Sequence, residues 1–473
     1  MVGPFIWEMI SIGHEESSPK CAHAGVKPHN GRLSSQAVTL HEKTVEKDWV
    51  HVTTPHDWRT TQVPKSGNRP YPDYPDAWQG FFPTNVGYYR KVFDFRPVKD
   101  KEHVTLTFDG IAGFSDVWLN GMWLGCHSTS YLPLVLEVTE LLRVDCPNTY
   151  NELHVARDGV NVTASVEDDG TAKIRLEIQL DNDGPSNVEG TIHVGVKAIG
   201  GPEITNTSAS YSIRGCSAST IVLETELENP KLWTLGQGNF QTFGIRSFDV
   251  GQDGISINGN PSQKIFGVNL HQDFGVYGGA VPKRIIERKL HLCAEMGANA
   301  IRCADHPPAP ELLDAADRLG MLVLTETRLL CSSSLMLERL QTLVMQSRSH
   351  PSVFAYSMGN EEVYAEGTEV AGRTMQRMVN VCKALNPTRP TIYEGLLKNR
   401  DRLHAIPDIQ GMHYRCVLGD IDIAVQVYST KPHILDEEGL FAAARGIYRY
   451  DKSKPYSGSF SHFRGSARHG TST

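Results

Sequence analysis

ANAIRCADHPPAPELLDAADRLGMLVL, residues 298–324, is the stretch that decides the fold. Residues 298–302 form a short apolar run typical of a buried strand, and residues 321–324 form another. Between them, residues 310–319 predict a helix. A strand, a helix and a second strand in succession indicate two parallel strands joined by a crossover helix.

The same unit repeats on both sides of this stretch, from about residue 255 almost to the end of the chain. Further strands are predicted at 264–270, 353–358, 391–393, 408–412 and 432–435, and further helices at 282–296 and 367–385. Seven strands of this kind predict a (β/α)8 TIM barrel in which the last strand has no candidate.

Upstream of the barrel, from about residue 48 to 250, the chain predicts antiparallel β-sandwiches. Alternating runs occur at 104–109, 115–119, 174–180, 190–196 and 221–227, and Asn120-Gly121 is a hairpin signal. We therefore expect a poorly ordered lead-in over 1–45, a first sandwich over 46–158, a second over 159–247, and a C-terminally truncated barrel over 248–473.

Composition excludes several classes of protein. The 473 residues carry a net charge of -8 and no basic run, so we expect no nucleic acid as a partner. No stretch has the ~20 consecutive apolar residues of a membrane span, so we expect no membrane partner either. The nine cysteines lack CxxC spacing and the N-terminus does not resemble a signal peptide, which favours the cytoplasm.

Two acidic stretches end predicted barrel strands that lie across the barrel mouth from each other. Glu361 follows strand four in Ser357-Met-Gly-Asn-Glu-Glu362, and Glu437 follows strand seven in Asp436-Glu-Glu438. Paired carboxylates that face one cleft are the apparatus of glycoside hydrolysis. On spacing alone, however, an ordinary solvated loop carboxylate is the favoured interpretation, because fold and position do not fix function.

A set of motifs along the chain favours a catalytic role for the two glutamates over an ordinary solvated position. They are Thr54-Pro-His-Asp-Trp58, Val86-Gly-Tyr-Tyr-Arg90, Phe108-Asp-Gly110, Val117-Trp-Leu-Asn-Gly121, Asn229-Pro-Lys-Leu-Trp233, Phe243-Gly-Ile-Arg246, Gly267-Val-Asn-Leu-His-Gln-Asp273, Glu295-Met-Gly-Ala-Asn-Ala-Ile-Arg302, Pro307-Pro-Ala-Pro-Glu311, His350-Pro-Ser352 and Gly359-Asn-Glu361. With them the chain resembles glycoside hydrolase family 2 over most of residues 45 to 450. The resemblance implies a jelly-roll sugar-binding domain, an immunoglobulin-like sandwich and a catalytic TIM barrel.

The resemblance also implies roles for individual residues. Glu361 matches the family's acid/base and Glu437 its nucleophile, with Glu438 as runner-up. The substrate-binding candidates are His271, Arg302, Asp305, Asn360 and Tyr414; of these, Asn360 matches a residue that holds the sugar 2-hydroxyl and Tyr414 a tyrosine that supports the nucleophile. The alternatives are a core-satisfied His271, a salt-bridged Arg302 and a packed Tyr414.

The sequence departs from the family pattern at several places. Asp305 stands where a sugar-contacting histidine is expected, and an ionised carboxylate only accepts hydrogen bonds. Thr325 and Tyr356 replace an aspartate and a tryptophan. Family segments after His154-Val-Ala156 and between Trp233 and Phe243 are missing, as is the eighth barrel strand with its aromatic residue.

The resemblance predicts a retaining hydrolase of terminal β-linked sugars, with β-galactosides as the first expectation. The local sequence around His271-Gln-Asp273 and Ala280-Val-Pro282 most resembles the β-galactosidase branch of the family. A β-glucuronidase, which would want an Asn-Lys pair where Lys398-Asn399 stands in reverse order, or a β-mannosidase remains an alternative. So does a catalytically inactive carbohydrate-binding remnant. No cofactor and no metal are expected, and a homo-oligomer is left open.

Overall fold

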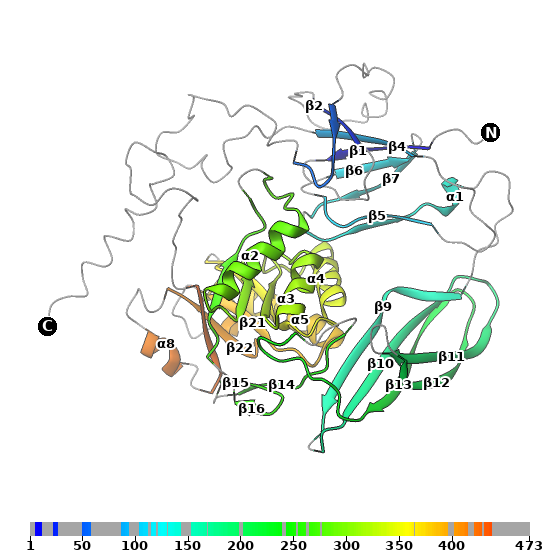
Figure 1. Ribbon diagram of the computed structural model, residues 1–473. Helices are drawn as coiled ribbons and strands as arrows, with labels where there is room; N and C mark the ends of the chain where they lie inside the picture. Colours follow the sequence, from blue (N-terminus) through cyan, green and yellow to red (C-terminus); the bar gives the residue numbers. More distant parts are fainter. Residues whose placement is uncertain are drawn as a thin grey trace, which may run out of the picture.

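The computed structural model describes residues 5–11, 22–26, 50–57, 87–93, 104–111, 115–119, 122–129, 131–142, 153–167, 169–197, 202–238, 243–251, 254–261, 264–274, 277–363, 365–395, 402–414, 421–427 and 430–437. They form two β-rich regions beside a parallel β/α region (Figure 1). None of the described helices is both long and apolar enough to cross a membrane.

The first β-rich region pairs a six-stranded sheet with a two-stranded one. The six-stranded sheet is antiparallel throughout, in the order β3-β2-β4-β1-β6-β7, and the second sheet is β5-β8. The elements are β1 (Phe5–Ser11), β2 (Ala22–Val26), β3 (Val50–Val52), β4 (Gly87–Phe93), β5 (Thr105–Phe108), β6 (Ser115–Leu119), β7 (Met122–His127), β8 (Leu134–Glu137) and α1 (Thr139–Leu142). Their core is Tyr89, Phe108, Ile111, Val117, Leu119 and Val138.

The expected lead-in over residues 1–45 differs from the structure at two places. Strands β1 and β2 lie within it and pair with β4, and β1 also pairs with β6. These partners come from residues 87–119, so the pairing is long-range and local composition gave no sign of it. The hairpin turn predicted at Asn120-Gly121 lies outside the described residues, but the two strands that flank it pair antiparallel as expected.

The second β-rich region contains the long strands that the alternating pattern predicted. Its sheets are β13-β10-β9 and β11-β12, and a small sheet β14-β15-β16 follows. The strands are β9 (Leu153–Val166), β10 (Ala172–Asn182), β11 (Val188–Lys197), β12 (Glu203–Ile213), β13 (Ser217–Leu227), β14 (Phe248–Gly251), β15 (Gly254–Ile257) and β16 (Asn260–Pro261). The boundary proposed near residue 158 falls inside β9, so a limit just before Leu153 would keep that strand whole.

The barrel has seven parallel strands in sequence order, β17 to β23. They are β17 (Gly267–Leu270), β18 (Ala300–Cys303), β19 (Leu322–Glu326), β20 (Val353–Asn360), β21 (Thr391–Gly395), β22 (Ile409–His413) and β23 (His433–Glu437). Within the described residues, β17 and β23 are each hydrogen-bonded to one neighbour only. These two edge strands nevertheless contact each other, so the barrel is nearly closed. The expected fold class is confirmed: two sandwiches precede a TIM barrel, of which the described residues supply seven strands.

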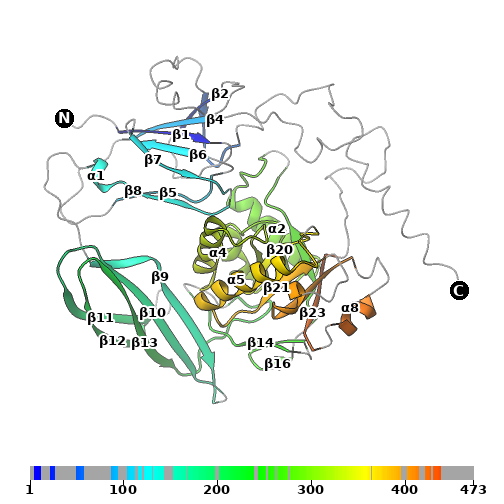
Figure 2. The same ribbon diagram turned by 180° about the vertical axis from the view of Figure 1, so that it is seen from behind.

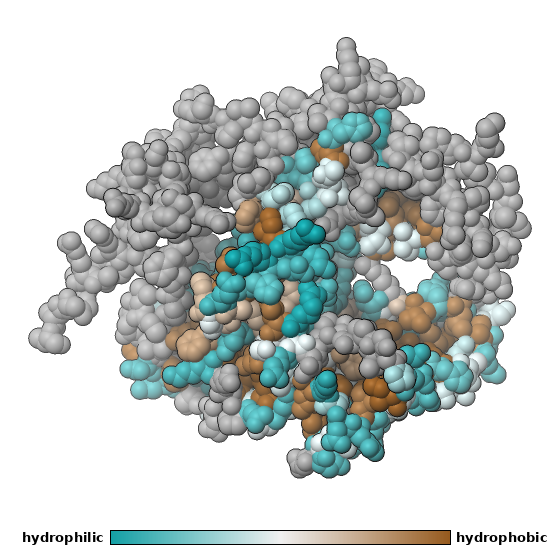
Figure 3. Space-filling view, in the orientation of Figure 1, coloured by the Kyte–Doolittle hydropathy of each residue, from teal (hydrophilic) through white to brown (hydrophobic). Residues whose placement is uncertain are grey.

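The helices cover the outside of this barrel. They are α2 (Lys283–Glu295), α3 (Pro310–Leu319), α4 (Ser334–Ser347), α5 (Glu369–Leu385), α6 (Arg402–Ala405) and α8 (Ile421–Val427). Helix α2 turns Ile286, Leu290 and Cys293 inward, and its outer surface is hydrophilic (Figure 3). Strands β18, β19 and β22 are buried at every position, as expected of parallel strands covered on both faces.

Helix α4 was not predicted from the sequence, and it and the residue that follows it contact the two sandwiches. Its N-terminus is capped by Ser333, whose side chain accepts from the backbone N–H of Met336. Arg339 donates to Ser128 Oγ of the first sandwich at 2.6 Å. Arg348, directly after the helix, donates to the carbonyl of Asp158 on β9 at 2.9 Å. Figure 2 shows the second sandwich beside the α4 and α5 side of the barrel.

Candidate active site

The candidate site lies where the carboxyl ends of the barrel strands meet. Polar side chains come from six neighbouring strands or the residue that follows them: Arg302 (β18), Glu326 (β19), Asn360 and Glu361 (β20), Glu394 (β21), His413 and Tyr414 (β22), and Asp436 and Glu437 (β23). Parallel strands present this edge together, so residues far apart in sequence converge there.

Arg302 is the hub of this group. Its side chain is 3% exposed and donates to Glu326 Oε2 at 3.1 Å, to Glu437 Oε2 at 2.8 Å and to Asn360 Oδ1 at 2.5 Å. Its Nε also lies 3.5 Å from Asp436 Oδ2. Burial alone would lower the pKa of Arg302, but the surrounding carboxylates outweigh burial and raise it. The guanidinium is therefore permanently charged and fixes the carboxylates in place.

Glu437 is held in its ionised form. Burial would raise its pKa, but a hydrogen bond from the Tyr414 hydroxyl and the positive charges of His413 and Arg302 lower the pKa below its usual value. The backbone N–H of Tyr414 also donates to the Glu437 carbonyl at 2.9 Å, which ties the ends of β22 and β23 together. A partly buried, ionised carboxylate of this kind is suited to nucleophilic attack.

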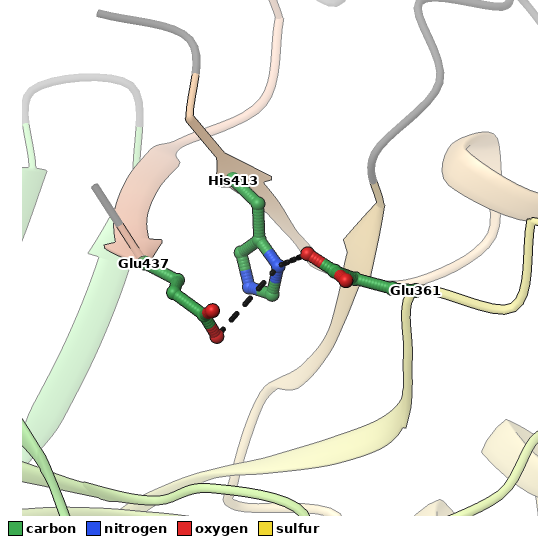
Figure 4. Close-up of side chains that lie close together, drawn as sticks. All are labelled: Glu361, His413 and Glu437. Atoms are coloured by element: carbon green, nitrogen blue, oxygen red, sulfur yellow. Dashed lines mark hydrogen bonds and ion pairs between the residues drawn. The ribbon is translucent and has the colours of Figure 1, made fainter. Parts of the chain in front are cut away.

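Glu361 faces Glu437 from the other side of the site. Its backbone has φ 52°, a left-handed conformation that non-glycine residues seldom adopt, and its N–H donates to the Glu394 carbonyl at 3.0 Å. Glu361 Oε1 lies 2.7 Å from His413 Nδ1 (Figure 4). One ligand atom from each of Glu361, His413 and Glu437 can be chosen so that all three lie within 4.8 Å of one another.

His413 lies between the two glutamates and is fully buried. Besides its contact with Glu361, Nδ1 lies 3.9 Å from Glu437 Oε2, and Nε2 lies 3.4 Å from Asp436 Oδ2. Burial would lower the pKa of His413, but hydrogen bonds with Asp436 and Glu361 raise the pKa to about 10. The ring therefore carries a positive charge at neutral pH.

Two further carboxylates, Glu326 and Glu394, are completely buried beside Arg302. Burial raises the pKa of each, with the neighbouring negative charges adding to it and Arg302 opposing it. Ser357 donates to Glu394 Oε2, while Oε1 of both glutamates has no hydrogen-bond partner among the described residues. A raised pKa favours the neutral acid, which limits the negative charge that Arg302 and His413 must balance.

Glu362 is adjacent to Glu361 in the sequence, but its side chain does not join the group of charged residues around Arg302. Its side chain turns to the backbone N–H of Leu330, which donates to Oε1 at 2.7 Å, and burial raises its pKa to about 7. Its own N–H donates to the Tyr393 hydroxyl at 3.2 Å. Glu438, the runner-up for the nucleophile, lies outside the described residues.

The structure brings together five of the residues singled out from the sequence: Arg302, Asn360, Glu361, Tyr414 and Glu437. His271 is exposed and does not contact this cluster among the described interactions. Asp305 has φ 63° on the loop after β18, is half-buried, and acts at a distance by raising the pKa of Glu326. His306, one residue later, accepts from the Gln272 N–H at 3.0 Å and stacks on Tyr131 of the first sandwich.

Sequence reasoning missed His413, Glu326, Glu394 and Asp436 as members of the site. Each ends or nearly ends a barrel strand, and Glu326 and Glu394 do so after apolar strand residues. A charged residue at the carboxyl end of a buried barrel strand was therefore the available signal.

The same three donor atoms are close enough to be considered for a metal ion. Atoms of these residues already have partners within the protein, since His413 Nδ1 contacts Glu361 and Glu437 Oε2 accepts from Arg302. We therefore assign the positive charge of this cluster to Arg302 and His413. The expectation that no metal is needed stays a prediction.

Three family models match the chain in consecutive order. The model described as "Glycosyl hydrolase 2 galactose-binding domain-like" matches residues 41–178, "Glycosyl hydrolases family 2" matches 153–255, and "Glycosyl hydrolases family 2, TIM barrel domain" matches 248–334 and 331–447. The three together extend from residue 41 to residue 447.

Curated relatives carry two kinds of name. A β-galactosidase from Bacteroides ovatus is 26% identical over 87% of this chain and 58% of the relative. A β-galactosidase from Lactococcus lactis is 24% identical over 74% of the chain and 40% of the relative. A putative β-glucuronidase from Formosa agariphila is 25% identical over 86% and 42%. The chain thus spans about half the length of these relatives.

Solved structures agree on the fold. A glycosyl hydrolase family 2 member from Bacteroides cellulosilyticus superposes with a TM-score of 0.74 at 22% identity, covering 89% of this chain and 61% of that one. β-Glucuronidase 2 from Bacteroides uniformis gives a TM-score of 0.68 at 18% identity, covering 91% and 59%.

Proposed function

Because the chain belongs to glycoside hydrolase family 2, we propose that it hydrolyses terminal β-linked sugars with retention of configuration. Glu437 is the nucleophile and Glu361 is the acid/base. Arg302 and Tyr414 hold Glu437 ionised, and Asn360, fixed by Arg302, is available to the sugar.

The observation that carries this proposal is the spacing of the two glutamates. A carboxylate oxygen of Glu361 and one of Glu437 lie within 4.8 Å of each other. Retaining glycosidases have carboxyl groups about 5–5.5 Å apart, whereas inverting enzymes need roughly 6.5–9.5 Å to admit a water molecule. The short spacing supports direct attack by a carboxylate.

Each residue then has a defined part in the reaction. Glu437 attacks the anomeric carbon while Glu361 protonates the leaving oxygen, and a glycosyl ester forms on Glu437. Glu361 then takes a proton from water, which attacks the anomeric carbon and releases Glu437. The depressed pKa of Glu437 favours the first step because only the ionised carboxylate is nucleophilic.

We propose a β-galactoside as the sugar. Support comes from the β-galactosidase names of the Bacteroides ovatus and Lactococcus lactis relatives. The name of the Formosa agariphila relative keeps a β-glucuronide as the alternative. Lys398-Asn399, the weak argument against a glucuronidase, lies outside the described residues.

The test compares purified full-length chain with the E437Q and E361Q variants on nitrophenyl β-galactoside, β-glucuronide and β-mannoside. We expect turnover of the galactoside by the parent chain and none by E437Q. The product's first-formed anomer, observed by NMR, should be β. Sugar binding without turnover in the parent chain would instead favour the inactive carbohydrate-binding remnant.

A further inference from the structure

We propose that His413 holds the catalytic proton: Glu361 and His413 share one proton, which the pair delivers to the leaving-group oxygen. His413 is thus a positioning residue that acts through Glu361. The inference rests on the proposed function, since it adds a proton store to the same site.

His413 connects the side chain of the acid/base Glu361 to the other charged groups of the site. Its Nδ1 lies 2.7 Å from Glu361 Oε1, a normal charge-assisted hydrogen bond. On the opposite side of the ring, Nε2 lies 3.4 Å from Asp436 Oδ2. The Asp436 Oδ1 atom accepts from the Met412 N–H at 3.2 Å, which fixes the carboxylate that orients the ring.

Charged and titratable groups face this ring from every neighbouring strand. Those in contact with it or acting on it are Glu361 after β20, Asp436 and Glu437 on β23, Arg302 on β18 and Tyr414 directly after His413. Glu326 on β19 and Glu394 on β21 lie beyond them, next to Arg302. Most are acidic, and Arg302 is the one cation among the described groups that opposes protonation of the ring. The raised pKa of His413 follows from this surplus of carboxylates.

In the resting site the shared proton lies on His413 Nδ1, yet the acid/base Glu361 must donate a proton to the leaving group. Sharing resolves this conflict. During glycosylation, Nδ1 passes its proton to Glu361, and Glu361 then gives this proton to the departing oxygen, which leaves the ring neutral and Glu361 without the proton. During hydrolysis of the ester, the proton taken from water returns through Glu361 to Nδ1, and Glu437 regains its negative charge.

The state of the ring can be observed directly by NMR of the full chain labelled with ¹⁵N-histidine. The His413 signal is the one absent from H413N. We expect an imidazolium that persists well above the ordinary histidine pKa of about 6.5, and that titrates at lower pH in E361Q and in D436N. A ring that is neutral at pH 7 would overturn the proposal, with or without turnover.

Kinetics test the delivery of the proton. The H413N side chain can still donate a hydrogen bond from near the Nδ1 position, but it cannot exchange a proton in this pH range. We expect the basic limb of its kcat/KM profile to move down by about one pH unit or more, because the variant lacks the ring that holds the shared proton at high pH. H413Q, which can still reach Asp436, should behave likewise.

The matched control is H350N. His350 also contacts a buried carboxylate, with Nδ1 2.5 Å from Asp317 Oδ2, but it lies outside the site. We expect its basic limb to coincide with that of the parent chain. An unchanged limb in folded H413N would overturn the proposal by showing that the hydrogen bond alone suffices. Absence of turnover in the parent chain would refute the proposed function, and the delivery step with it.

Discussion

Two buried arginines, Arg302 and Arg246, have opposite surroundings. Arg302, 3% exposed, is surrounded by carboxylates that raise its pKa. Arg246, 5% exposed, donates to the carbonyls of Pro351 and Val353, and burial lowers its pKa well below the usual value. Its guanidinium also lies over the rings of Trp233 and Phe248.

The two sets of surroundings indicate different roles: Arg246 holds two parts of the structure together, whereas Arg302 belongs to the candidate active site. The Arg246 cluster joins the end of the second sandwich to the barrel, and there Trp233 Nε1 donates to the Asp317 carbonyl at 2.8 Å. Backbone carbonyls satisfy a cation without adding a titratable group. Around Arg302 the partners are all acids or an amide, so charge accumulates there and pKa values shift. Shifted pKa values in a concave site are a mark of function.

The largest effect is expected when the proposed nucleophile, Glu437, is replaced. We predict that E437Q lowers kcat/KM by about 1000-fold or more, because an amide cannot form the glycosyl ester. Its melting temperature should fall while the unfolding stays cooperative, since the amide oxygen can accept from Tyr414 or from Arg302 but the amide NH2 cannot accept from the other. Substantial residual turnover would show that another carboxylate attacks the sugar.

The next prediction exchanges the two arginines for methionine separately. R302M should lose about 100-fold or more in kcat/KM, because Glu437 loses its positively charged hydrogen-bond donor. It should also lose roughly 3–5 kcal/mol of stability, since the buried carboxylates lose their cation. R246M should lose about 1–3 kcal/mol through unsatisfied carbonyls and keep its kcat. Urea unfolding and kinetics on both variants check this, and equal losses of kcat would contradict the distinction.

A smaller effect is expected from Y414F. Y414F removes the hydroxyl group that donates a hydrogen bond to the ionised Glu437. The pKa of Glu437 should therefore rise, and kcat/KM should fall about 10-fold. The acidic limb of the pH profile should therefore move to higher pH. The pKa of Glu437 is lower in the folded protein than in the unfolded chain. The ionised carboxylate therefore stabilises the fold at pH values above its pKa in the unfolded chain, and this stabilisation is lost as the pH falls through its pKa in the folded protein. Acid unfolding of Y414F should show a smaller loss across that window.

The smallest effect expected is that of EDTA. If Arg302 and His413 supply the positive charge of the site, prolonged dialysis against EDTA should change kcat/KM less than about 2-fold. Magnesium or zinc added afterwards should not raise the rate. A clear loss in EDTA that divalent cations restore would mean that a metal belongs to the site.

The barrel could be predicted from sequence because its strands are short apolar runs with helices between them. Residues 322–326 and 353–360 are buried almost throughout and so carry little polar ambiguity. Helix α4 was missed, although Ser333 before it is a capping residue and its buried residues Leu337, Leu340 and Val344 follow helical spacing. Strands β1 and β2 could not be foreseen because their partners lie far along the chain.

The site was predictable only where a motif named the residue. Glu361 and Glu437 were found that way, and the structure brings their oxygens within 4.8 Å. His413 stood beside the recognised Tyr414 yet went unnoticed, because its importance comes from Asp436 on the next strand and Glu361 two strands away. Such relations exist only after the sheet has curved, so local sequence does not contain them.

Trapping with a 2-deoxy-2-fluoro β-galactoside, followed by peptide mass spectrometry, tests most directly whether Glu437 becomes covalently bound to the sugar. The proposed mechanism predicts one fluorosugar on the peptide that contains Glu437, with fragmentation placing it on that residue and no label in E437Q. A label on Glu438, or turnover that yields the inverted anomer without any labelled peptide, would contradict it.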